Sequence, residues 1–238
     1  MKQMRGWLTL VIGGVILLQG CVPDNNAETK TRANEVREDM DMSESLLQAA
    51  ERSDTKTIKR LIEDGADLNK KGSDGQTAAM IAAYNNDVET AKILIKAGAD
   101  VNIQDNMNNN PFLYAGAEGY IEILKLTIEA GADPAIVNRY GGTALIPAAE
   151  HGHIDAIKEL LTKTDIDVNY VNDLGWTALL EAIILNDGNV IQQQTVQLLI
   201  DYGADVNIAD RNNVTPLQHA REKGFKEIEQ ILLTAGAK

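Results

Sequence analysis

The side chains that could catalyse a reaction or bind a metal are few and scattered along this chain. Two of its three histidines fall in His151-Gly152-His153, and Asp155 follows two residues later. Two imidazoles beside one carboxylate are a weak metal signal, because no further ligand is clustered with them in the sequence. The third histidine, His219, stands alone. We therefore predict no metal site and no cofactor.

A catalytic nucleophile with a base beside it is not suggested either. Cys21 is the only cysteine, so the chain can form no internal disulfide, and it follows an apolar leader rather than a catalytic motif. Gly141-Gly142 lacks the preceding strand and the glycine spacing of a phosphate-binding loop. Once the leader, a tether and the repeats are assigned, no stretch remains for a catalytic domain. We predict that the protein is not an enzyme.

Residues 1–20 are predicted to be a signal peptide. A basic start precedes an apolar run over residues 7–18, which is too short to span a bilayer comfortably. The next segment resembles the lipobox of bacterial lipoproteins, Leu18-Gln19-Gly20-Cys21. The resemblance implies lipid attachment to Cys21 and cleavage before it, which would make residues 21–40 a flexible tether to a bacterial cell-envelope membrane on its extracytoplasmic side. An ordinary cleaved signal with an incidental cysteine, or a short uncleaved anchor, is the alternative.

A five-residue phrase, Gly98-Ala99-Asp100-Val101-Asn102, organises the rest of the chain. Its copies at Gly65, Gly98 and Gly131 lie 33 residues apart, as do those at Gly203 and Gly236, and residues 165–169 carry a variant. A fixed period of this size is the signature of a repeat architecture, in which each unit packs only on its neighbours. We therefore predict a single elongated array over residues 41–238.

Each unit is predicted to contain two helices. Alanines recur in the first half of the units, and leucines and isoleucines recur in the second half, so the first helices should pack closely while the second fill the space behind them. The glycine of the phrase suits the left-handed residue that ends a helix. Good N-cap residues precede the first helices at Thr77, Asn110, Thr143, Thr177 and Thr215. The predicted units are residues 41–71, 72–104, 105–137, 138–171, 172–209 and 210–238.

The sequence resembles ankyrin repeats in the segments 173–182 (DLGWTALLEA) and 214–220 (VTPLQHA), each followed by Gly-Ala-Asp or Gly-Ala. The resemblance implies an all-α solenoid of about six helix-turn-helix units with β-hairpin fingers. It also implies that Gly152-His153 is the ordinary start of a second helix. Pro134-Ala135 departs from the phrase, and one extra residue lies near Thr164-Asp165. Five more lie within residues 186–194, as either a recognition loop or a neutral insertion.

The resemblance further implies a non-catalytic protein–protein interaction scaffold that binds a partner protein through its concave face. In the family, binding residues lie at the hairpin tips and on the exposed face of the first helix. Aromatic residues and arginine dominate interface energies. Carried over by position, the predicted partner-binding residues are Tyr84, Asn106, Met107, Arg139, Tyr140, Leu174, Trp176, Ile184 and Arg211. The alternative is that Trp176 packs sideways on the neighbouring finger and that Ile184 belongs to the core.

The formal net charge of −13 bears on the class of partner. A negative surface repels phosphate backbones, so we expect no nucleic acid, and it speeds encounter with a basic protein surface. We also expect no small-molecule substrate. An immunity or inhibitor protein that neutralises an envelope-acting toxin or enzyme is one alternative function, and an enzyme or metal protein is another.

Overall fold

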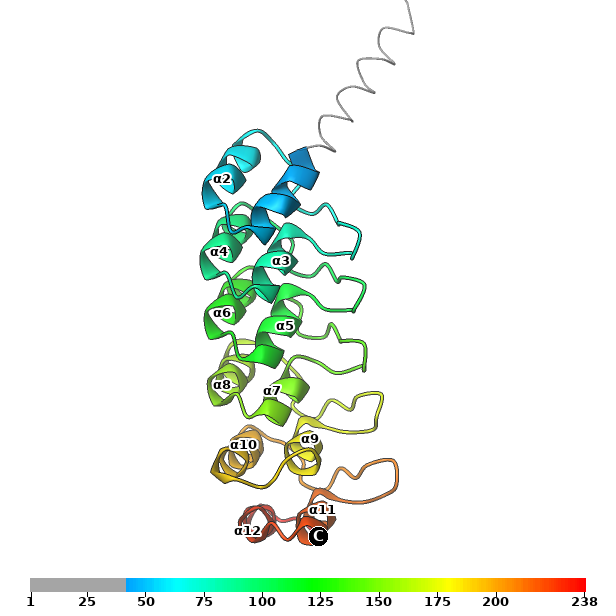
Figure 1. Ribbon diagram of the computed structural model, residues 1–238. Coiled ribbons are helices and arrows are strands. Elements are labelled where there is room, and N and C mark those ends of the chain that lie inside the picture. The colour runs from blue at the N-terminus through cyan, green and yellow to red at the C-terminus, as the bar shows by residue number, and fades with distance from the viewer. Residues whose placement is uncertain (1–41) are drawn as a thin grey trace, which may run out of the picture. The chain divides into compact units, whose positions relative to one another are not determined.

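The computed structural model describes residues 42–238 (Figure 1). The predicted signal peptide, Cys21 and the tether lie outside the described residues. Within the described part, the chain forms twelve helices in six pairs and no strand. None of the helices in residues 42–238 is long and apolar enough to cross a membrane. The predicted all-α repeat solenoid is therefore confirmed.

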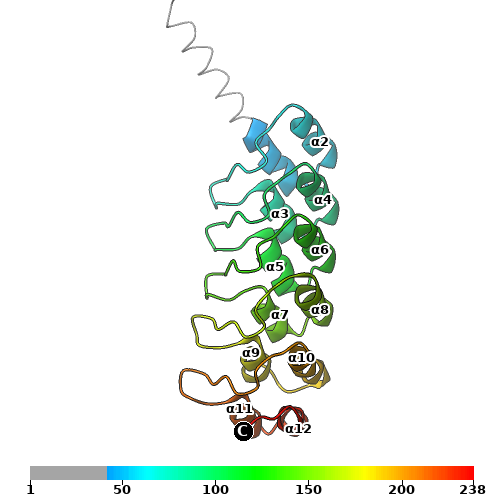
Figure 2. The ribbon, with the colours of Figure 1, turned by 180° about the vertical axis from the view of Figure 1, so that it is seen from behind.

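The helices of the array stand in two layers, with loops that we call fingers extending beyond the inner layer (Figures 1 and 2). The inner layer contains a first helix described over residues 42–51, α3 (Ala78–Tyr84), α5 (Pro111–Glu118), α7 (Leu145–His151), α9 (Ala178–Ile184) and α11 (Pro216–Lys223). The outer layer contains α2 (Thr55–Glu63), α4 (Val88–Lys96), α6 (Ile121–Glu129), α8 (Ile154–Lys163), α10 (Val190–Asp201) and α12 (Lys226–Thr234).

The core lies between the two layers. Alanines of the inner helices, such as Ala82 and Ala148, are fully buried, and their small size lets adjacent inner helices approach closely. Three outer helices contain two adjacent leucines, and one leucine of each pair is buried, namely Leu160, Leu199 and Leu232. Truncating one of these leucines to alanine would cost about 2–5 kcal/mol of stability.

The fingers are tight chain reversals, each closed by a backbone hydrogen bond that spans five residues. In three of them the amides of Asp105, Asn138 and Asn172 donate to the carbonyl four residues on, at 2.8, 2.8 and 3.0 Å. The other two fingers, over residues 72–76 and 210–214, close in the same way. Few backbone hydrogen bonds join one finger to the next. The predicted β-hairpins are therefore present as reversals, but too few bonds form for a strand ladder.

The recurrent phrase ends five of the six outer helices of residues 42–238 and also joins neighbouring units. Gly98 has a φ of +98°, and the next amide, Ala99, donates to Leu94 in α4 at 3.1 Å. Asn102 then accepts the amide of Asp133 in the next unit on its Oδ1, at 2.8 Å. We call this bond the asparagine link. It recurs at Asn69, Asn169 and Asn207, with bonds of 2.9, 2.8 and 3.1 Å.

The asparagine link is missing between the third and fourth helix pairs, because Ala135 stands where the other units have asparagine. The amide of Ala135 still donates to Asp133 Oδ1 at 2.9 Å, so the local turn keeps its shape. A cavity of about 180 Å³ lies beside it, lined in part by Ala135, Thr143 and Asp167. The following helix, α8, also ends differently: the Thr164 hydroxyl donates to Leu160 O at 2.6 Å where other outer helices use glycine.

Four of the five predicted N-caps are confirmed. The side chains of Thr77, Asn110, Thr177 and Thr215 each accept the backbone N–H of the residue three positions later. Thr215 and Gln218 also form a capping box. These bonds satisfy amides that the first turn of a helix leaves without intrahelical partners.

The prediction for Thr143 is wrong, and Pro147 explains why. Helix α7 begins at Leu145, and the buried Thr143 hydroxyl has no hydrogen-bond partner. In the other four capped helices the residue four after the cap donates its amide to the cap carbonyl. Pro147 has no N–H, so Ile146 donates to Thr143 O instead, at 3.2 Å. The Ile146 amide, which the Thr143 hydroxyl would otherwise accept, is therefore already bonded to Thr143 O.

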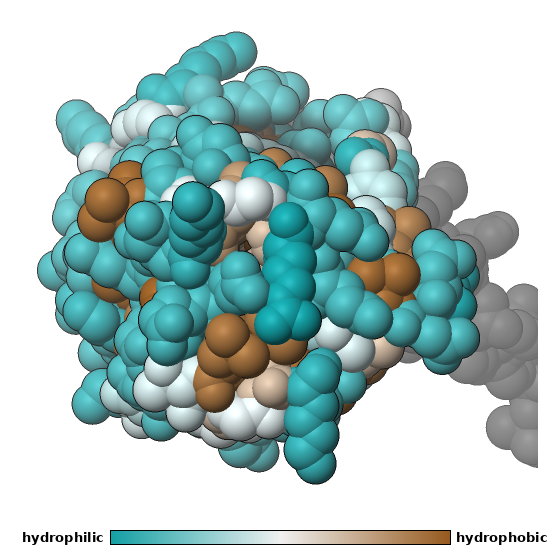
Figure 3. All heavy atoms as spheres, turned by 90° about the horizontal axis from the view of Figure 1, so that it is seen from below, coloured by the Kyte–Doolittle hydropathy of each residue, from teal (hydrophilic) through white to brown (hydrophobic). Residues whose placement is uncertain are grey.

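The last unit presents a mostly hydrophilic surface where a further unit would otherwise stack (Figure 3). Arg221 in α11 donates to Glu229 in α12 at 2.7 Å across this unit. Terminal repeats of solenoids need such polar outer faces to stay soluble.

Candidate functional site

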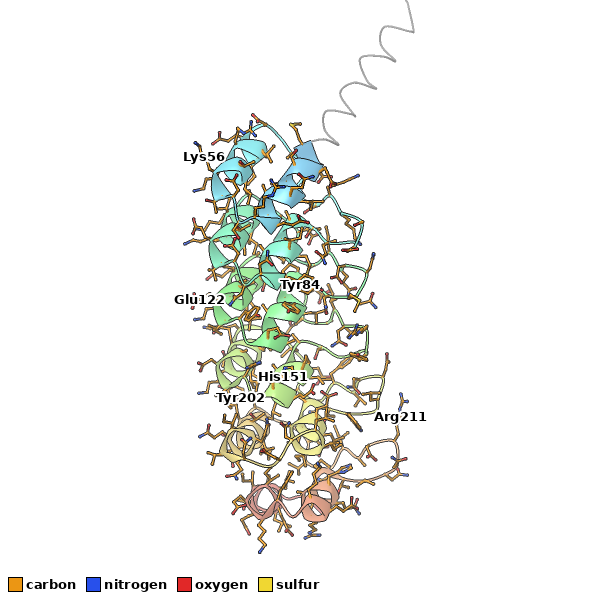
Figure 4. All side chains as sticks on the ribbon, viewed as in Figure 1. Lys56, Tyr84, Glu122, His151, Tyr202 and Arg211 are labelled. Carbon is orange, nitrogen blue, oxygen red and sulfur yellow. The ribbon has the colours of Figure 1, made fainter. Side chains whose placement is uncertain are left out.

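A groove of about 590 Å³ lies on the inner side of the array. It lies between the inner helices α5, α7 and α9 and the fingers at residues 105–109, 138–142 and 172–176, with Tyr84 of α3 at one end. We call it the concave groove. Figure 4 shows Tyr84 and His151, which both line it, on the inner-helix layer.

The groove opens because two repeated positions carry small side chains there. Four residues after the cap, other units have Tyr114, Glu181 and His219, but α7 has Pro147. Seven residues after the cap, α3 has Tyr84, whereas α5 has Ala117. Both Pro147 and Ala117 line the groove, so the sequence leaves a hollow where longer side chains stand elsewhere.

Tyr84 is held rigidly at its end of the groove. Its hydroxyl donates to Asp105 Oδ2 at 2.6 Å and accepts from Asn109 Nδ2 at 3.1 Å. Its ring meets that of Tyr114 edge-on, with 4.5 Å between centroids. Burial, together with the bond to the Asp105 carboxylate, raises the pKa of Tyr84 to about 12. The hydroxyl is therefore a neutral, fixed donor at ordinary pH.

Exposed apolar and aromatic side chains from successive fingers form the rim of the groove. Met107, Tyr140 and Leu174 are 47%, 52% and 47% exposed. The Arg139 guanidinium lies 4.9 Å from the Tyr140 ring centroid, and its Nη1 lies 3.8 Å from Met107 Sδ. Side chains of this kind, gathered on a concave surface, are typical of a binding site.

Five of the nine predicted partner-binding residues thus line one groove, namely Tyr84, Met107, Arg139, Tyr140 and Leu174. The other four lie outside it. Asn106 binds the preceding finger through Nδ2 to Ser73 O at 3.2 Å. Trp176 and Ile184 are half-buried, and Ile184 is not part of the hydrophobic core. Arg211 lies on the last finger, against Gly175 of the preceding one (Figure 4).

The sequence analysis missed an acidic pair on the floor of the groove. Glu181 is only 5% exposed, and its Oε1 accepts from Asn172 Nδ2 at 2.8 Å. Burial, and then the nearby charge of Glu150, raise the pKa of Glu181 to about 7. The sequence signal that could have identified Glu181 is a carboxylate at the repeat position where other units have Ile81 or Tyr114. We had treated it as part of the repeat motif.

The insertion in the fifth unit braces the end of α7. Part of it lengthens α10 to 12 residues, while the other described outer helices have 9 or 10. Asn186 Nδ2 and Gln192 Nε2 both donate to the carbonyl of Glu150, at 2.8 and 3.1 Å. The insertion therefore positions Glu150 at the groove, and whether it also contacts a partner stays a prediction.

Two of the three histidines contact the preceding repeat, and the third is bonded within its own repeat. His151 Nδ1 lies 2.9 Å from Ala117 O, and the rings of His151 and His153 are 5.6 Å apart. Burial, and then the neighbouring His151, lower the pKa of His153. His219 bonds Asp210 Oδ2 at 2.9 Å. Over residues 42–238, no group of three histidine, cysteine or acidic side chains is placed to hold a metal ion.

The stacked helix pairs, the protruding fingers and the concave groove define a repeat solenoid of the kind that presents an extended concave surface. The sequence matches the family described as ankyrin repeats (3 copies) over residues 29–105, 46–138, 112–210 and 172–238. The chain belongs to the ankyrin repeat family. Such repeats are typically protein-binding scaffolds and are usually non-catalytic.

Known relatives include bacterial ankyrin repeat proteins. A crystallised ankyrin repeat domain from Acinetobacter baumannii AYE is 50% identical over 82% of this chain and 98% of its own, with a TM-score of 0.80. The crystallised ankyrin repeat protein EF0377 is 44% identical over 80% of this chain and 97% of its own, with a TM-score of 0.78. The ankyrin repeat protein YahD of Escherichia coli K12 is 56% identical over 81 residues, or 34% of this chain. The match spans 40% of the length of YahD.

Proposed function

We propose that this protein is a non-catalytic scaffold that binds a partner protein in its concave groove. The observation that carries the proposal is the convergence of Tyr84, Met107, Arg139, Tyr140 and Leu174 on one hollow. These residues come from four successive units, and three of them are about half exposed. A partner that covered them would remove apolar and aromatic surface from water, which favours association.

Preorganisation supports the same proposal. Tyr84 is fixed by two hydrogen bonds, and Asp105 also accepts the amides of Met107 and Asn109 on its Oδ1, at 2.8 and 2.9 Å. Adjacent fingers are tied by the bond from Asp173 N to Tyr140 O, at 3.0 Å. A surface that is already ordered loses little conformational entropy on docking, so more of the contact energy remains as affinity.

The proposal is tested by cross-linking in intact cells, followed by affinity measurements with the captured protein. We expect Tyr140→Ala and Leu174→Ala each to weaken binding by about 1–4 kcal/mol without unfolding the chain. Tyr202→Ala is the matched control, because Tyr202 is 44% exposed and caps the outer helix α10. Equal retention of the partner by the two groove variants and the control would contradict a binding role for the groove.

We also propose that the scaffold is lipid-anchored to a bacterial cell-envelope membrane through Cys21. The support is the sequence Leu18-Gln19-Gly20-Cys21 after an apolar leader, because one cysteine stands where a lipobox requires it. Cys21→Ser should move the protein from the membrane fraction to the soluble fraction of cells. Unchanged membrane association of that variant would refute the anchor and leave the groove proposal intact.

A further inference from the structure

We propose that the concave groove binds a lysine or arginine side chain of the partner, with its cationic end between Glu181 and Glu150. This inference rests on the proposed function, since it specifies the chemistry that the same groove recognises. The argument begins with Glu181, a residue that is only 5% exposed and that lines the groove.

Only one oxygen of that carboxyl group is bonded to the described residues. Asn172 donates to Oε1, whereas Oε2 has no hydrogen-bond partner among residues 42–238. Asn172 itself is held by the amides of Leu174 and Trp176, which both donate to its Oδ1 at 3.0 Å. Glu181 is therefore fixed at one oxygen and free at the other, and the residue lines the groove. A buried carboxylate with a free oxygen is costly unless a donor or a cation reaches it.

The charges around Glu181 favour a cation. Glu118, Glu150 and Glu181 line the groove, and the one lysine or arginine among the lining residues is Arg139. The Arg139 guanidinium lies on Tyr140 and Met107 at the rim and makes no ion pair with Glu181. His151 lies on α7 and offsets part of the negative charge when protonated. The insertion holds the backbone of Glu150 in place.

The walls suit the aliphatic part of a long basic side chain. Leu174, Leu185 and Ile146 line the same groove as the acidic pair, and Leu174 and Leu185 are each 47% exposed. Lysine and arginine bury their methylene stems on apolar surface while the charged end seeks a polar partner. A purely apolar segment would seal Glu181 away from water without a partner and would therefore bind poorly.

Binding of a cation should release a proton. In the unbound protein the pKa of Glu181 is raised to about 7, so near neutral pH about half of the molecules carry the protonated form. A cation favours the ionised form and lowers this pKa, so affinity should rise with pH and level off above the unbound pKa. With one linked proton, the affinity changes by at most about tenfold per pH unit.

The test uses the full chain and two small probes, Nα-acetyl-lysine methylamide and Nα-acetyl-arginine methylamide, with the norleucine analogue as the uncharged control. Carbon-13 NMR of the glutamate carboxyl groups follows Glu181, which Glu181→Gln assigns by loss of its signal. We expect the basic probes to lower the midpoint of the Glu181 titration and the norleucine analogue to leave it unchanged. Glu181→Gln and Glu150→Gln should each weaken the basic probes at least about tenfold.

Glu222→Gln is the matched control, because Glu222 occupies in α11 the repeat position that Glu150 occupies in α7 but is exposed away from the groove. An unchanged Glu181 titration in the presence of both basic probes would overturn the inference, as would equal weakening by Glu222→Gln. If Leu174→Ala abolishes partner binding while Glu181→Gln and pH leave it unaffected, the scaffold function stands and the cation site fails. If the basic probes bind but the groove variants retain the partner, the cation site stands and the scaffold function of the groove fails.

Discussion

Replacing Pro147 with alanine should stabilise the protein, although proline normally stiffens a chain. The new residue would supply the missing N–H, which can donate to Thr143 O as the equivalent residues do in the other capped helices. The Ile146 amide, now 3.2 Å from that carbonyl, would then be free to donate to the Thr143 hydroxyl. That hydroxyl is buried and has no hydrogen-bond partner among residues 42–238. One substitution therefore exchanges one backbone bond for another and adds one cap.

The magnitude follows from these changes. The new backbone bond to Thr143 O replaces the present one from Ile146, so these two terms nearly cancel, and the net gain is the capping bond, which contributes about 1 kcal/mol. The loss of proline makes the unfolded chain more flexible, which offsets about 0.4–1 kcal/mol. We expect Pro147→Ala to raise the free energy of unfolding by up to about 0.5 kcal/mol, since the offset removes part of the gain from the cap.

A double-mutant cycle with Thr143→Val tests the mechanism rather than the sign alone. Valine keeps the shape of threonine but lacks the hydroxyl, so Thr143→Val should leave the stability of the native chain unchanged or raise it, because it removes a buried hydroxyl without a partner among residues 42–238. In the Pro147→Ala background it should cost about 1 kcal/mol, because the cap then exists. Thr177→Val is the control, since Thr177 already accepts from Leu180 N at 3.2 Å and its loss should cost about as much. Urea unfolding of the full chain, followed by helical circular dichroism, measures all four. Additive effects of Thr143→Val and Pro147→Ala would refute the reasoning.

Two further predictions concern the asparagine links and Glu181. Asn102→Ala removes the 2.8 Å bond to Asp133 N and should destabilise the array by about 1 kcal/mol. Ala135→Asn supplies the missing link and should stabilise the array. Urea unfolding measures both variants, and changes of the same sign in the free energy of unfolding would contradict a stabilising role of the link. Because the pKa of folded Glu181 is raised to about 7 from 4.5, its ionisation destabilises the folded state fully above the raised pKa and not at all below the ordinary one. Glu181→Gln should therefore stabilise the protein by about 1–2 kcal/mol above neutral pH. This gain in stability should disappear as the pH falls toward the ordinary pKa of glutamate. A gain that is independent of pH would show that burial of the charge is not the cause.

The fold was predictable because the signals that specify it are local and repeated. Gly98 and its counterparts, the capping threonines and the alanine-rich inner helices each act within one unit. The wrong N-cap prediction at Thr143 also has a local cause. It could be found only by tracing which backbone amide bonds which carbonyl, because Pro147 lacks the N–H that would bond Thr143 O. The asparagine links could not be read from one unit, because Asn102 and Asp133 belong to different ones.

The candidate site was only partly predictable, because position within a repeat indicates which way a side chain faces but not what lies beside it. Met107, Tyr140 and Leu174 were found because finger tips face outward in every unit. Trp176 and Arg211 occupy similar positions, yet they lie outside the groove. Glu181 was missed because its burial depends on Asn172 and on the neighbouring helix rather than on its place in the motif.

The departures from the repeat gather where the groove is, and a physical reason connects them. Pro147 and Ala117 are short where other units place tyrosine, glutamate or histidine, so they open the hollow that a regular array would fill. Pro147 also removes the cap of α7, and Ala135 removes the link that would tie the fourth unit to the third. The insertion supplies a compensating tie to the same helix, since Asn186 and Gln192 bond the carbonyl of Glu150. An array of identical units would be more stable, but it would have neither this groove nor the acidic pair at its floor.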